Sequence, residues 1–487
     1  MNWIITENNK KIKSLDIPTI SIEEIRADFG KMNMRLIGFF GKQEFDNIRL
    51  YVILCDDKVG KLYVTSSLFT PDVKSYESLT PTYSQFHIFE REFFEEFGIE
   101  PLNHPWLKPL RKNQNKYPFF EMRGDEVHQV AVGPIHAGVI EPGHFRFMCH
   151  GEKVYDLEIA LGYQHRNVEY LFTKNQTFKN QLAESVCGDS VIAYNMAYSS
   201  AMESLSNTTI SSKAQIIRRI ALEMERIGIH IGDMGAIAGD IAYQMGASIF
   251  GVTRTLVINT MLEISGSRFG RGLISVGGVN FDIDKPLSEK IINTLDEVAK
   301  TVDRTTKVML NSPTVISRLE RTGVVSSETA KALGAVGMAA RASGIDVDSR
   351  FDLNDSWYTS LNVVKPFKAL GDVHSRFKLR YKEIKQSIKI IKKLLKKLEE
   401  FSSETIKNIV NYNLDSNSLV ISVVEGWRGE VVHVAITGAD NNLIRYKIKD
   451  PSFNNWYMLA MAVRNNGISD FPLCNKSFNL SYCGNDL

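Results

Sequence analysis

The stretch AESVCGDSVIAYN, residues 183–195, brings a thiol, a carboxylate and a hydroxyl close together along the chain. The spacing Cys187-x-x-Ser190 is that of a Cys-x-x-Cys metal pair whose second thiol is replaced by serine. Thiolates bind soft metals, whereas a neutral hydroxyl is a hard and weak ligand. Three interpretations follow: a metal site, a metal site that has lost ligands, or the buried start of a helix.

The other cysteines do not complete a metal site in the sequence. There are five, at positions 55, 149, 187, 474 and 483, and no Cys-x-x-Cys occurs anywhere. An odd and scattered set argues against a disulfide scaffold and fits a reducing cytoplasm. Four thiolates that are closely paired in sequence are therefore not available.

Length and composition describe an ordinary globular protein. The chain has 487 residues, too many for one hydrophobic core, so two or three domains are expected. Hydrophobic residues make up 44%, charged residues 23%, and the net charge of +2 gives no reason to expect a nucleic acid partner. No signal peptide is expected, and Asp233 and Asp240 interrupt a long apolar stretch before it reaches membrane-span length.

Residues 1–115 predict a small α/β domain. The runs RLIGFFGK, IRLYVILCDD and GKLYVTSSLF are rich in β-branched and aromatic residues and are separated by turn residues, as strands require. In FHIFEREFFEEFGIE the apolar residues follow a helical period that ends near Gly98. A proline-containing stretch follows, and residues 116–125 are assigned as a connector.

Residues 126–487 predict a mainly helical domain with a few strands at its two ends. Strands are expected near its beginning and again in SLVISVVEGW, EVVHVAITGA and NNLIRYKIKD, with helical spacing between. The segment YKEIKQSIKIIKKLLKKLEE carries a narrow apolar stripe among lysines. This pattern predicts a bundle helix with a solvated face, and a membrane-surface helix is the alternative. The fold class is therefore α+β.

Six stretches in order resemble a known family. The sequence EREFFEEFGIEPLNHPWLKPLR resembles the small hydrophilic subunit of respiratory complex I that flanks the quinone-site subunit. Five further stretches resemble the large subunits of membrane-bound NiFe hydrogenases and that quinone-site subunit. They are GPIHAGVIEPGHFRF, LGYQHRNVEYL, LEMERIGIHIGDMGAIAGD, GDVHSRFKLRYKEIKQS and VEGWRGE. Fusion of the two parts is similar to the large subunit of formate-hydrogenlyase-type complexes. The resemblance covers nearly the whole chain.

In the hydrogenases of this family, two Cys-x-x-Cys pairs hold a nickel–iron centre. The resemblance places the early pair at Cys187 and Ser190. It places the late pair, after an Asp-Pro dipeptide, at Ser452 and Asn455. Hydroxyl and amide oxygens are poor ligands for low-valent nickel and iron. The resemblance therefore implies a branch that lacks the nickel–iron centre, with no metal bound by this chain.

The residues around the early pair carry separate expectations. Cys187 is expected to be a small buried side chain, with a residual metal or redox thiol as the alternative. Asp189 is expected to cap the helix that follows. Glu184 matches a family glutamate associated with proton transfer, which makes it a candidate catalytic residue.

A second group lies in the GPIHAG and HRNVE motifs. His136 and His165 are candidate catalytic residues that carry protons or order a cavity, and Arg166 and Glu169 are candidates for the interface with an iron–sulfur subunit. Equally weighted is a structural interpretation, in which HRNVE is a buried helix start and His165 and Glu169 pair across one turn.

Other polar residues are expected to be structural. Glu223, Arg226 and His230 share one helix face, which predicts an internal ion network rather than a ligand set. Arg376 in DVHSRF is expected to form a structural salt bridge, with a partner contact as the alternative.

Quinone binding is tested by two positions. In complex I a histidine of the glycine–histidine loop and a tyrosine hold the quinone head. Of the two loop histidines in that pattern, His136 matches only the first, and the tyrosine position falls close to Thr177. The sequence thus departs from the quinone-binding pattern as well.

The resemblance leaves several functions open. The first is a peripheral subunit of a membrane-associated, complex-I-like or hydrogenase-like oxidoreductase complex without its own nickel–iron centre. The alternatives are a quinone-reducing subunit of an NADH:quinone-oxidoreductase-like complex, and a non-catalytic scaffold for an iron–sulfur subunit; the missing thiols argue against an active NiFe hydrogenase. The expected partners are a ferredoxin-like or small hydrogenase-like iron–sulfur subunit and the membrane subunits of an antiporter-like arm. NAD(H) is expected to act only through partner subunits, and the expected location is cytoplasmic, at the inner face of the cell membrane.

Overall fold

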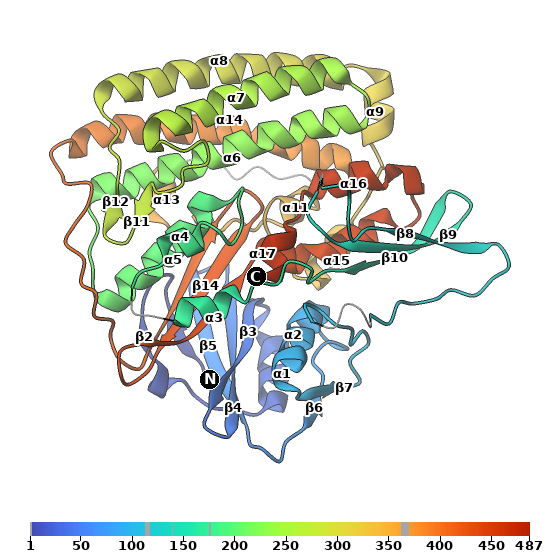
Figure 1. The fold of residues 1–487 in the computed structure, drawn as a ribbon, viewed down its shortest axis with the longest axis vertical. Coiled ribbons are helices and arrows are strands. Elements are labelled where there is room, and N and C mark those ends of the chain that lie inside the picture. The colour runs from blue at the N-terminus through green and yellow to red at the C-terminus, as the bar shows by residue number, and fades with distance from the viewer. Residues whose placement is uncertain (1, 113–116, 139, 175–176, 362–369) are drawn as a thin grey trace.

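A computed structural model describes residues 2–112, 117–138, 140–174, 177–361 and 370–487. Four long helices lie side by side at the top of Figure 1, and the sheets lie below them. These helices are α6 (Ser212–Asp240), α7 (Gln244–Ser265), α8 (Lys285–Leu310) and α14 (Val373–Leu398). Neighbouring pairs are α6 with α7, α6 with α14, α7 with α8 and α8 with α14.

The apolar stripe of α14 faces the bundle. Its members Ile384, Ile388, Ile391, Leu395 and Leu398 are all buried in the main core, while most of the lysines on the helix are at least partly exposed. The prediction of a bundle helix is confirmed, because no stripe is left for a membrane surface. Among the described residues, α7 alone has the length and apolar composition of a membrane span, and it packs between α6 and α8.

Below the bundle the chain is layered, because two adjacent sheets are buried on both faces. The first sheet has the order β1-β5-β4-β3 and is antiparallel. Its strands are β1 (Ile4–Thr6), β3 (Arg35–Glu44), β4 (Asn47–Asp56) and β5 (Lys61–Phe69). Along β4, Leu50, Val52 and Leu54 face a core with α1 (Ile22–Met32) and α2 (His87–Phe97). The alternate residues Tyr51 and Ile53 face the second sheet.

The second sheet joins the two predicted domains. Its order is β15-β14-β13-β2, so β2 (Ile12–Lys13) from the N-terminal part pairs with strands from the C-terminal part. Those strands are β13 (Ser418–Glu425), β14 (Glu430–Thr437) and β15 (Leu443–Lys449). An apolar cluster between the sheets contains Ile37 and Ile53 from one part and Ile421 and Val434 from the other. The boundary between residues 1–115 and 126–487 stays a prediction, and the two parts share this cluster.

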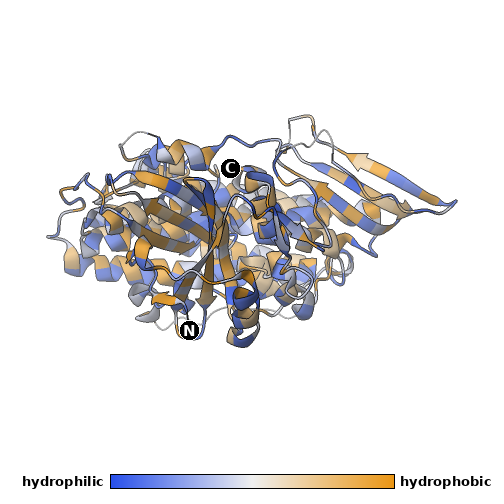
Figure 2. Cartoon of the chain, turned by 90° about the horizontal axis from the view of Figure 1, so that it is seen from below, coloured by the Kyte–Doolittle hydropathy of each residue, from blue (hydrophilic) through white to orange (hydrophobic). Residues whose placement is uncertain are grey.

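The remaining elements belong to both parts of the chain. A three-stranded sheet of β8 (Val127–Val132), β9 (His144–His150) and β10 (Lys153–Ala160) extends beyond the body of the protein (Figures 1 and 2). The C-terminal helices are α15 (Pro451–Val463), α16 (Phe471–Phe478) and α17 (Tyr482–Asp486). The shorter helices are α3 (Val168–Thr173), α4 (Asn180–Ala183), α5 (Val191–Ser206), α9 (Pro313–Leu319), α10 (Ser327–Ala332), α11 (Gly337–Ala342), α12 (Ser349–Asp352) and α13 (Ser356–Thr359). The short strands and 3-10 turns are β6 (Ser75–Glu77), β7 (Glu100–Leu102), β11 (Ile274–Ser275), β12 (Gly278–Val279), η1 (Ser14–Asp16), η2 (Ser84–Phe86), η4 (Glu399–Phe401) and η5 (Ile468–Asp470).

The α+β prediction is confirmed, with helices from α3 to α14 between strand-rich ends.

The polar face of α6 forms the predicted ion network. His230 Nε2 and Glu383 Oε2 lie 2.8 Å apart, and Arg226 Nη1 lies 3.4 Å from the same oxygen. Glu223 accepts hydrogen bonds from Arg350 at 3.0 and 3.2 Å. All of these side chains are buried, so each charge needs its partner.

The shared cluster between the two sheets makes a prediction about cleavage. A protease cut within residues 117–125, which form no helix or strand in the structure, should leave both fragments bound to each other, because Ile421 and its neighbours remain buried between the sheets. Gel filtration of the cut protein should give one peak that contains both fragments, at the elution volume of the intact chain. Separation into two folded fragments without denaturant would show that the parts are independent.

Candidate functional site

The early family positions lie in the turn before α5. Cys187 is buried, and its sulfur lies 3.1 Å from Asp189 Oδ1 and 3.1 Å from Ser481 Oγ. Arg428 Nη1 lies 3.4 Å from the same sulfur and 3.5 Å from Ser190 Oγ. Two of the four positions therefore share one guanidinium group.

Asp189 holds that guanidinium and does not cap α5. Its two carboxylate oxygens accept hydrogen bonds from Arg428 at 2.6 and 2.7 Å. Burial would raise the pKa of Asp189, but Arg428 outweighs burial and holds the pKa below its usual value. The expected cap is wrong, because Glu225 on α6 accepts the Ile192 N–H at 2.8 Å instead. Ser190 is the N-cap residue and makes no side-chain cap bond.

The late positions lie on the first turn of α15. Ser452 Oγ accepts the Ser481 N–H at 2.8 Å, and the Asn455 amide bonds both the N–H and the C=O of Val336, at 3.2 and 3.1 Å. Asp450 caps the helix by accepting the Ser452 N–H at 2.6 Å, and it also accepts the Tyr194 hydroxyl. The side-chain atoms that could bind a metal at both late positions are therefore hydrogen-bonded to backbone groups.

The C-terminal segment passes between the two pairs. Arg428 Nε donates to the Asn479 carbonyl at 2.5 Å, and the Trp456 indole donates to the Ser481 carbonyl at 3.3 Å. Ser481 Oγ lies 3.5 Å from Cys483 Sγ as well as close to Cys187. Residues 479–483, which we call the C-terminal plug, thus contact groups from both pairs.

Glu184 lies beside this region in a dry environment. It is buried, and its Oε1 accepts hydrogen bonds from Asn195 Nδ2 and Gly272 N, each at 2.8 Å. Burial raises the pKa of Glu184 above its usual value. A carboxyl group of this kind can hold a proton more readily than an exposed one.

The two candidate histidines bond to backbone carbonyls. His136 Nε2 lies 2.9 Å from the Gly143 carbonyl in its own loop, and His165 Nδ1 lies 2.7 Å from the Asp486 carbonyl. Glu169 accepts the Ile448 N–H at 2.9 Å and pairs with Lys447. The His165–Glu169 pair of the structural interpretation is wrong, because α3 begins only at Val168 and leaves His165 outside the helix.

Arg166 ties the C-terminus to the Cys187 turn. Its guanidinium donates to the carbonyls of Ser185, Val186 and Cys483 at 2.7, 2.9 and 3.3 Å. Its backbone N–H donates to the Leu487 carbonyl at 2.7 Å. Arg166 therefore positions both segments that meet at the site.

The quinone-related positions do not face one cavity in the described structure. Thr177 lines a cavity of about 380 Å³ together with Phe178, Tyr198 and Tyr412. His136 is not among the described residues that line it. The geometry gives no reason to join these two residues into one binding site.

Arg376 is buried, and the described residues give it no carboxylate partner within ion-pair distance. Its guanidinium donates to Ser477 Oγ at 2.8 Å and to the carbonyls of Gly371 and Gly323 at 2.7 and 2.9 Å. Burial lowers its pKa to about 10. The expected salt bridge is wrong, and the residue fixes loops around α14 through neutral groups.

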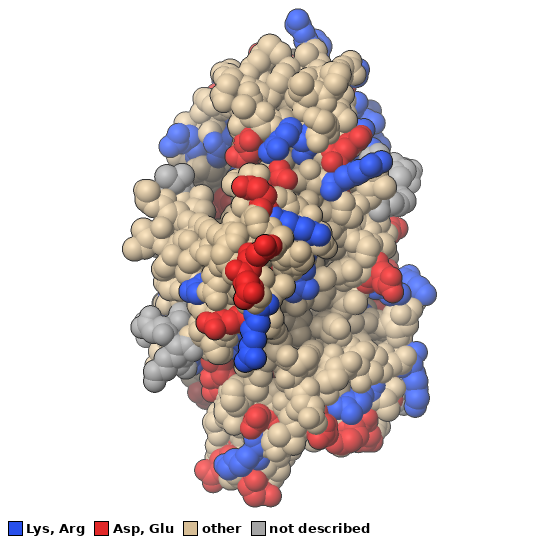
Figure 3. Space-filling model, turned by 90° about the vertical axis from the view of Figure 1, so that its right-hand side faces the viewer, with Lys and Arg blue, Asp and Glu red and all other residues tan. Residues whose placement is uncertain are grey.

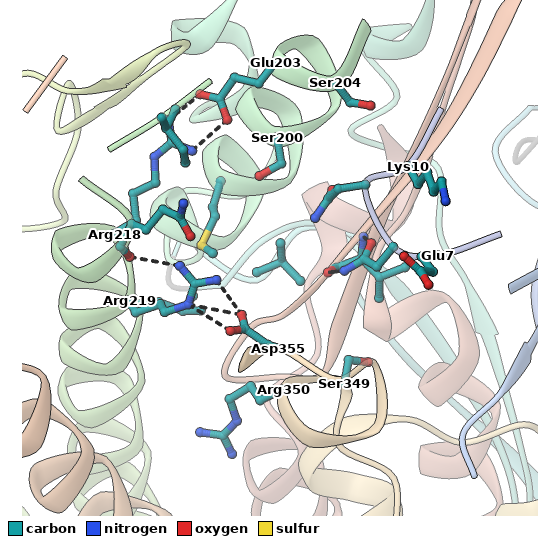
Figure 4. Close-up of a pocket in the computed structure, with 18 of the residues that line it drawn as sticks. Glu7, Lys10, Ser200, Glu203, Ser204, Arg218, Arg219, Ser349, Arg350 and Asp355 are labelled. Atoms are coloured by element: carbon teal, nitrogen blue, oxygen red, sulfur yellow. Dashed lines mark hydrogen bonds and ion pairs between the residues drawn. The ribbon is translucent and has the colours of Figure 1, made fainter. Parts of the chain in front are cut away.

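A cavity of about 840 Å³ lies elsewhere, between α5, α6 and residues 7–11 (Figure 4). Its arginines are paired: Arg218 donates to Glu203 at 2.6 and 3.0 Å, and Arg219 donates to Asp355 at 2.7 Å. None of the candidate site residues lines this cavity. Within the described residues, no group of three or more His, Cys, Asp or Glu side chains is arranged to hold a metal ion.

Several residues at the site gave no usable signal in the sequence. Cys483, Ser481 and Glu225 are far from Cys187 along the chain, and no spacing rule links them to it. Arg428 lies in the VEGWRGE motif, so the motif pointed to its segment but not to its contact with Asp189.

Glu225 predicts a pH dependence of stability. Burial raises its pKa from 4.5 to about 8, so the folded protein retains a proton that the unfolded chain loses. The stability from this group is fully present below pH 4.5 and should be lost as the pH rises toward 8. Urea unfolding at a series of pH values should show this decline in the wild type and a shallower one in Glu225→Gln. The exposed Glu289→Gln should behave as the wild type, and an unchanged slope in Glu225→Gln would contradict the assignment.

Sequence comparisons connect both parts of the chain to one group of proteins. The family described as "Respiratory-chain NADH dehydrogenase, 49 Kd subunit" matches residues 240–419, and that described as "Respiratory-chain NADH dehydrogenase, 30 Kd subunit" matches residues 32–125. Formate hydrogenlyase subunit 5 of Escherichia coli is 27% identical, with 90% of this chain and 81% of that protein covered. Membrane-bound hydrogenase subunit alpha of Pyrococcus furiosus is 29% identical, with 70% and 83% covered. An NADH-quinone oxidoreductase subunit of Herpetosiphon aurantiacus is 28% identical, with 70% and 94% covered.

A solved structure shares the fold. One chain of the membrane-bound sulfane sulfur reductase, described as an archaeal respiratory membrane complex, superposes with a TM-score of 0.68 at 20% identity, over 74% of this chain and 99% of that one. The region that matches the 30-kDa subunit precedes the region that matches the 49-kDa subunit, in the same order as the motifs that resemble each of them. The chain therefore carries a region of the complex I 30-kDa subunit family and a region of the 49-kDa subunit family fused in one polypeptide, and subunits of membrane-bound hydrogenases are among its relatives.

Proposed function

We propose that this chain is a peripheral subunit of a membrane-associated, complex-I-like or hydrogenase-like oxidoreductase complex and has no nickel–iron centre of its own. Electrons pass through an iron–sulfur partner subunit, and membrane subunits of an antiporter-like arm anchor the complex. The chain lies on the cytoplasmic face of the cell membrane, and NAD(H), where used, binds to other subunits. The relatives, which are subunits of membrane-bound and NADH-quinone complexes by name, support this assignment.

The observation that carries the proposal is the set of contacts at the four family positions. One thiol, two hydroxyls and one amide stand there, and hard oxygen donors do not fit a low-valent nickel–iron pair. Arg428 also brings a fixed positive charge to 3.4 Å from Cys187 Sγ, where it opposes a cation. The residues at the four family positions therefore do not fit a nickel–iron centre.

Nickel analysis tests this part of the proposal. The complex purified with this chain should contain substoichiometric nickel and show no hydrogen uptake, because Cys187 is the only thiol among the four family positions. As a control, nickel added to the same preparation should be removed again by desalting, because one thiol among the four family positions does not hold it. Stoichiometric nickel in the untreated complex, or hydrogen-uptake activity, would contradict the absence of the centre.

The proposed docking face is built around the loop between β8 and β9. Ile135 in this loop is 83% exposed, and Tyr163 is also exposed. Gly143 packs closely on Tyr482, which joins the loop to the C-terminal segment. The next residue in that segment is Cys483, whose carbonyl accepts a hydrogen bond from Arg166. On the side from which the β8–β10 sheet projects, acidic and basic side chains are interspersed with uncharged surface (Figure 3). We place Ile135 at the centre of the proposed interface, because the buried centre of a protein–protein interface is more apolar than its rim.

A single substitution tests the docking face. Ile135→Asp should weaken co-purification of the iron–sulfur subunit with the tagged chain from membranes, because it places a charge at the centre of a buried contact; hot-spot changes of this kind cost about 2 kcal/mol or more. Ile409→Asp is the matched control, since Ile409 is 98% exposed elsewhere on the surface. Equal recovery of partners by both variants would contradict the assignment. Arg166 and Glu169 are less suitable sites for this test, because their side chains also make internal contacts.

A further inference from the structure

The C-terminal plug brings a second thiol to Cys187. Ser481 Oγ lies 3.1 Å from Cys187 Sγ and 3.5 Å from Cys483 Sγ, so it lies between the two sulfur atoms. The two residues are far apart in the sequence, and Cys483 is not one of the four family positions.

The contacts that hold this pair are specific. Ser481 is fixed by its N–H to Ser452 Oγ at 2.8 Å, and its hydroxyl accepts the Gly484 N–H at 2.9 Å. Arg166 bonds the Cys483 carbonyl and the two carbonyls before Cys187. The same arginine thus holds both cysteine segments, which keeps the two cysteines next to each other.

The two thiols differ in access. Cys187 is 1% exposed, whereas Cys483 is partly exposed at the surface of the plug. The other three cysteines are buried in β4, β9 and α16. A small solute can therefore reach Cys483 first, because Cys187 is almost completely covered.

The charges around Cys187 favour a thiolate that forms during a reaction. Arg428 Nη1, 3.4 Å from Cys187 Sγ, can stabilise a developing negative charge there. At rest, the neighbouring Cys483 thiol and burial raise the pKa of the Cys187 thiol, so it carries its proton at neutral pH. A reaction at Cys187 should then become faster as the pH rises.

We propose that Cys187 and Cys483 form a dithiol site that reacts with a low-molecular-weight disulfide and closes to an intramolecular disulfide. The Cys483 thiolate attacks one sulfur of the small disulfide, and one thiolate leaves and takes a proton. The Cys187 thiolate then attacks the Cys483 sulfur, and the second small thiolate leaves and takes a proton. Two protein thiols are oxidised by two electrons, and one small disulfide is reduced to two thiols.

Closure of this bond ties the C-terminal plug to the turn before α5. The plug contacts Arg428 and Trp456, so a bond between the plug and this turn also restrains the residues around the four family positions. The proposal does not depend on which partner subunits the chain has, because both cysteines belong to this chain.

The test is disulfide mapping of the full-length chain after equilibration in glutathione buffers of different redox ratio, with acid quenching before alkylation. The wild type should yield a peptide pair linked through Cys187 and Cys483. For this two-electron couple the ratio of disulfide to dithiol should change tenfold for every change of about 30 mV in buffer potential. Cys474→Ser, which removes another buried thiol from the same end of the chain, should leave the linked pair unchanged.

Two further outcomes decide the order of events. Cys187→Ser should accumulate glutathione on Cys483, because the attacked sulfur then has no resolving thiol. Cys483→Ser should leave Cys187 reduced at every ratio, because glutathione disulfide cannot reach it. The proposal is overturned if the wild type itself carries glutathione on Cys483 without the internal link, or if both cysteines stay reduced in the most oxidising buffer; this mapping needs no variant to fold.

Discussion

A buried network of charges below the helix bundle is the constraint on which the rest of the structure depends. Arg341 donates to Glu383 on α14 at 2.8 and 3.0 Å and to Glu425 at the end of β13 at 2.7 Å. Arg226 on α6 also contacts Glu383 and donates to the Glu425 carbonyl at 2.7 Å. An unpaired charge at this depth would cost about 3–5 kcal/mol, so the pairs fix how the helices and the sheet meet.

This network positions the turn between β13 and β14, and the turn positions the site. Arg226 also holds the Gly426 carbonyl at 3.1 Å, and the Trp427 indole donates to the Asp189 carbonyl at 2.8 Å. Gly337 has a positive φ of 65°, and a Cβ there would lie 2.0 Å from the Arg428 carbonyl, so only glycine allows this approach. The guanidinium of Arg428 reaches Cys187 because the backbone behind it is held on both sides.

The region of the four family positions is organised by protein groups that bond to one another. Ser452 and Asn455 hold backbone groups of Ser481 and Val336, and Cys187 lies against Ser481. Each donor therefore has a partner within the chain. A site of this kind resists rearrangement, because removal of one partner leaves another buried polar group unsatisfied. Glu184 adds a carboxyl group whose pKa burial raises beside this region.

The sequence alone determined the elements and the family. Periodicity located α2, α14 and the strands, since one buried face imposes a repeat on nearby residues, and the order of the motifs identified both fused parts. Residue types also gave the loss of three thiols at positions 190, 452 and 455. Local spacing failed for His165 and Glu169, because the helix starts later than the pattern suggested. Only the tertiary structure decided that Arg428 pairs with Asp189, that Glu225 caps α5 and that Cys483 lies beside Cys187. These contacts join residues far apart in the chain, and their geometry is set by the packing of sheets and helices between them rather than by any local repeat.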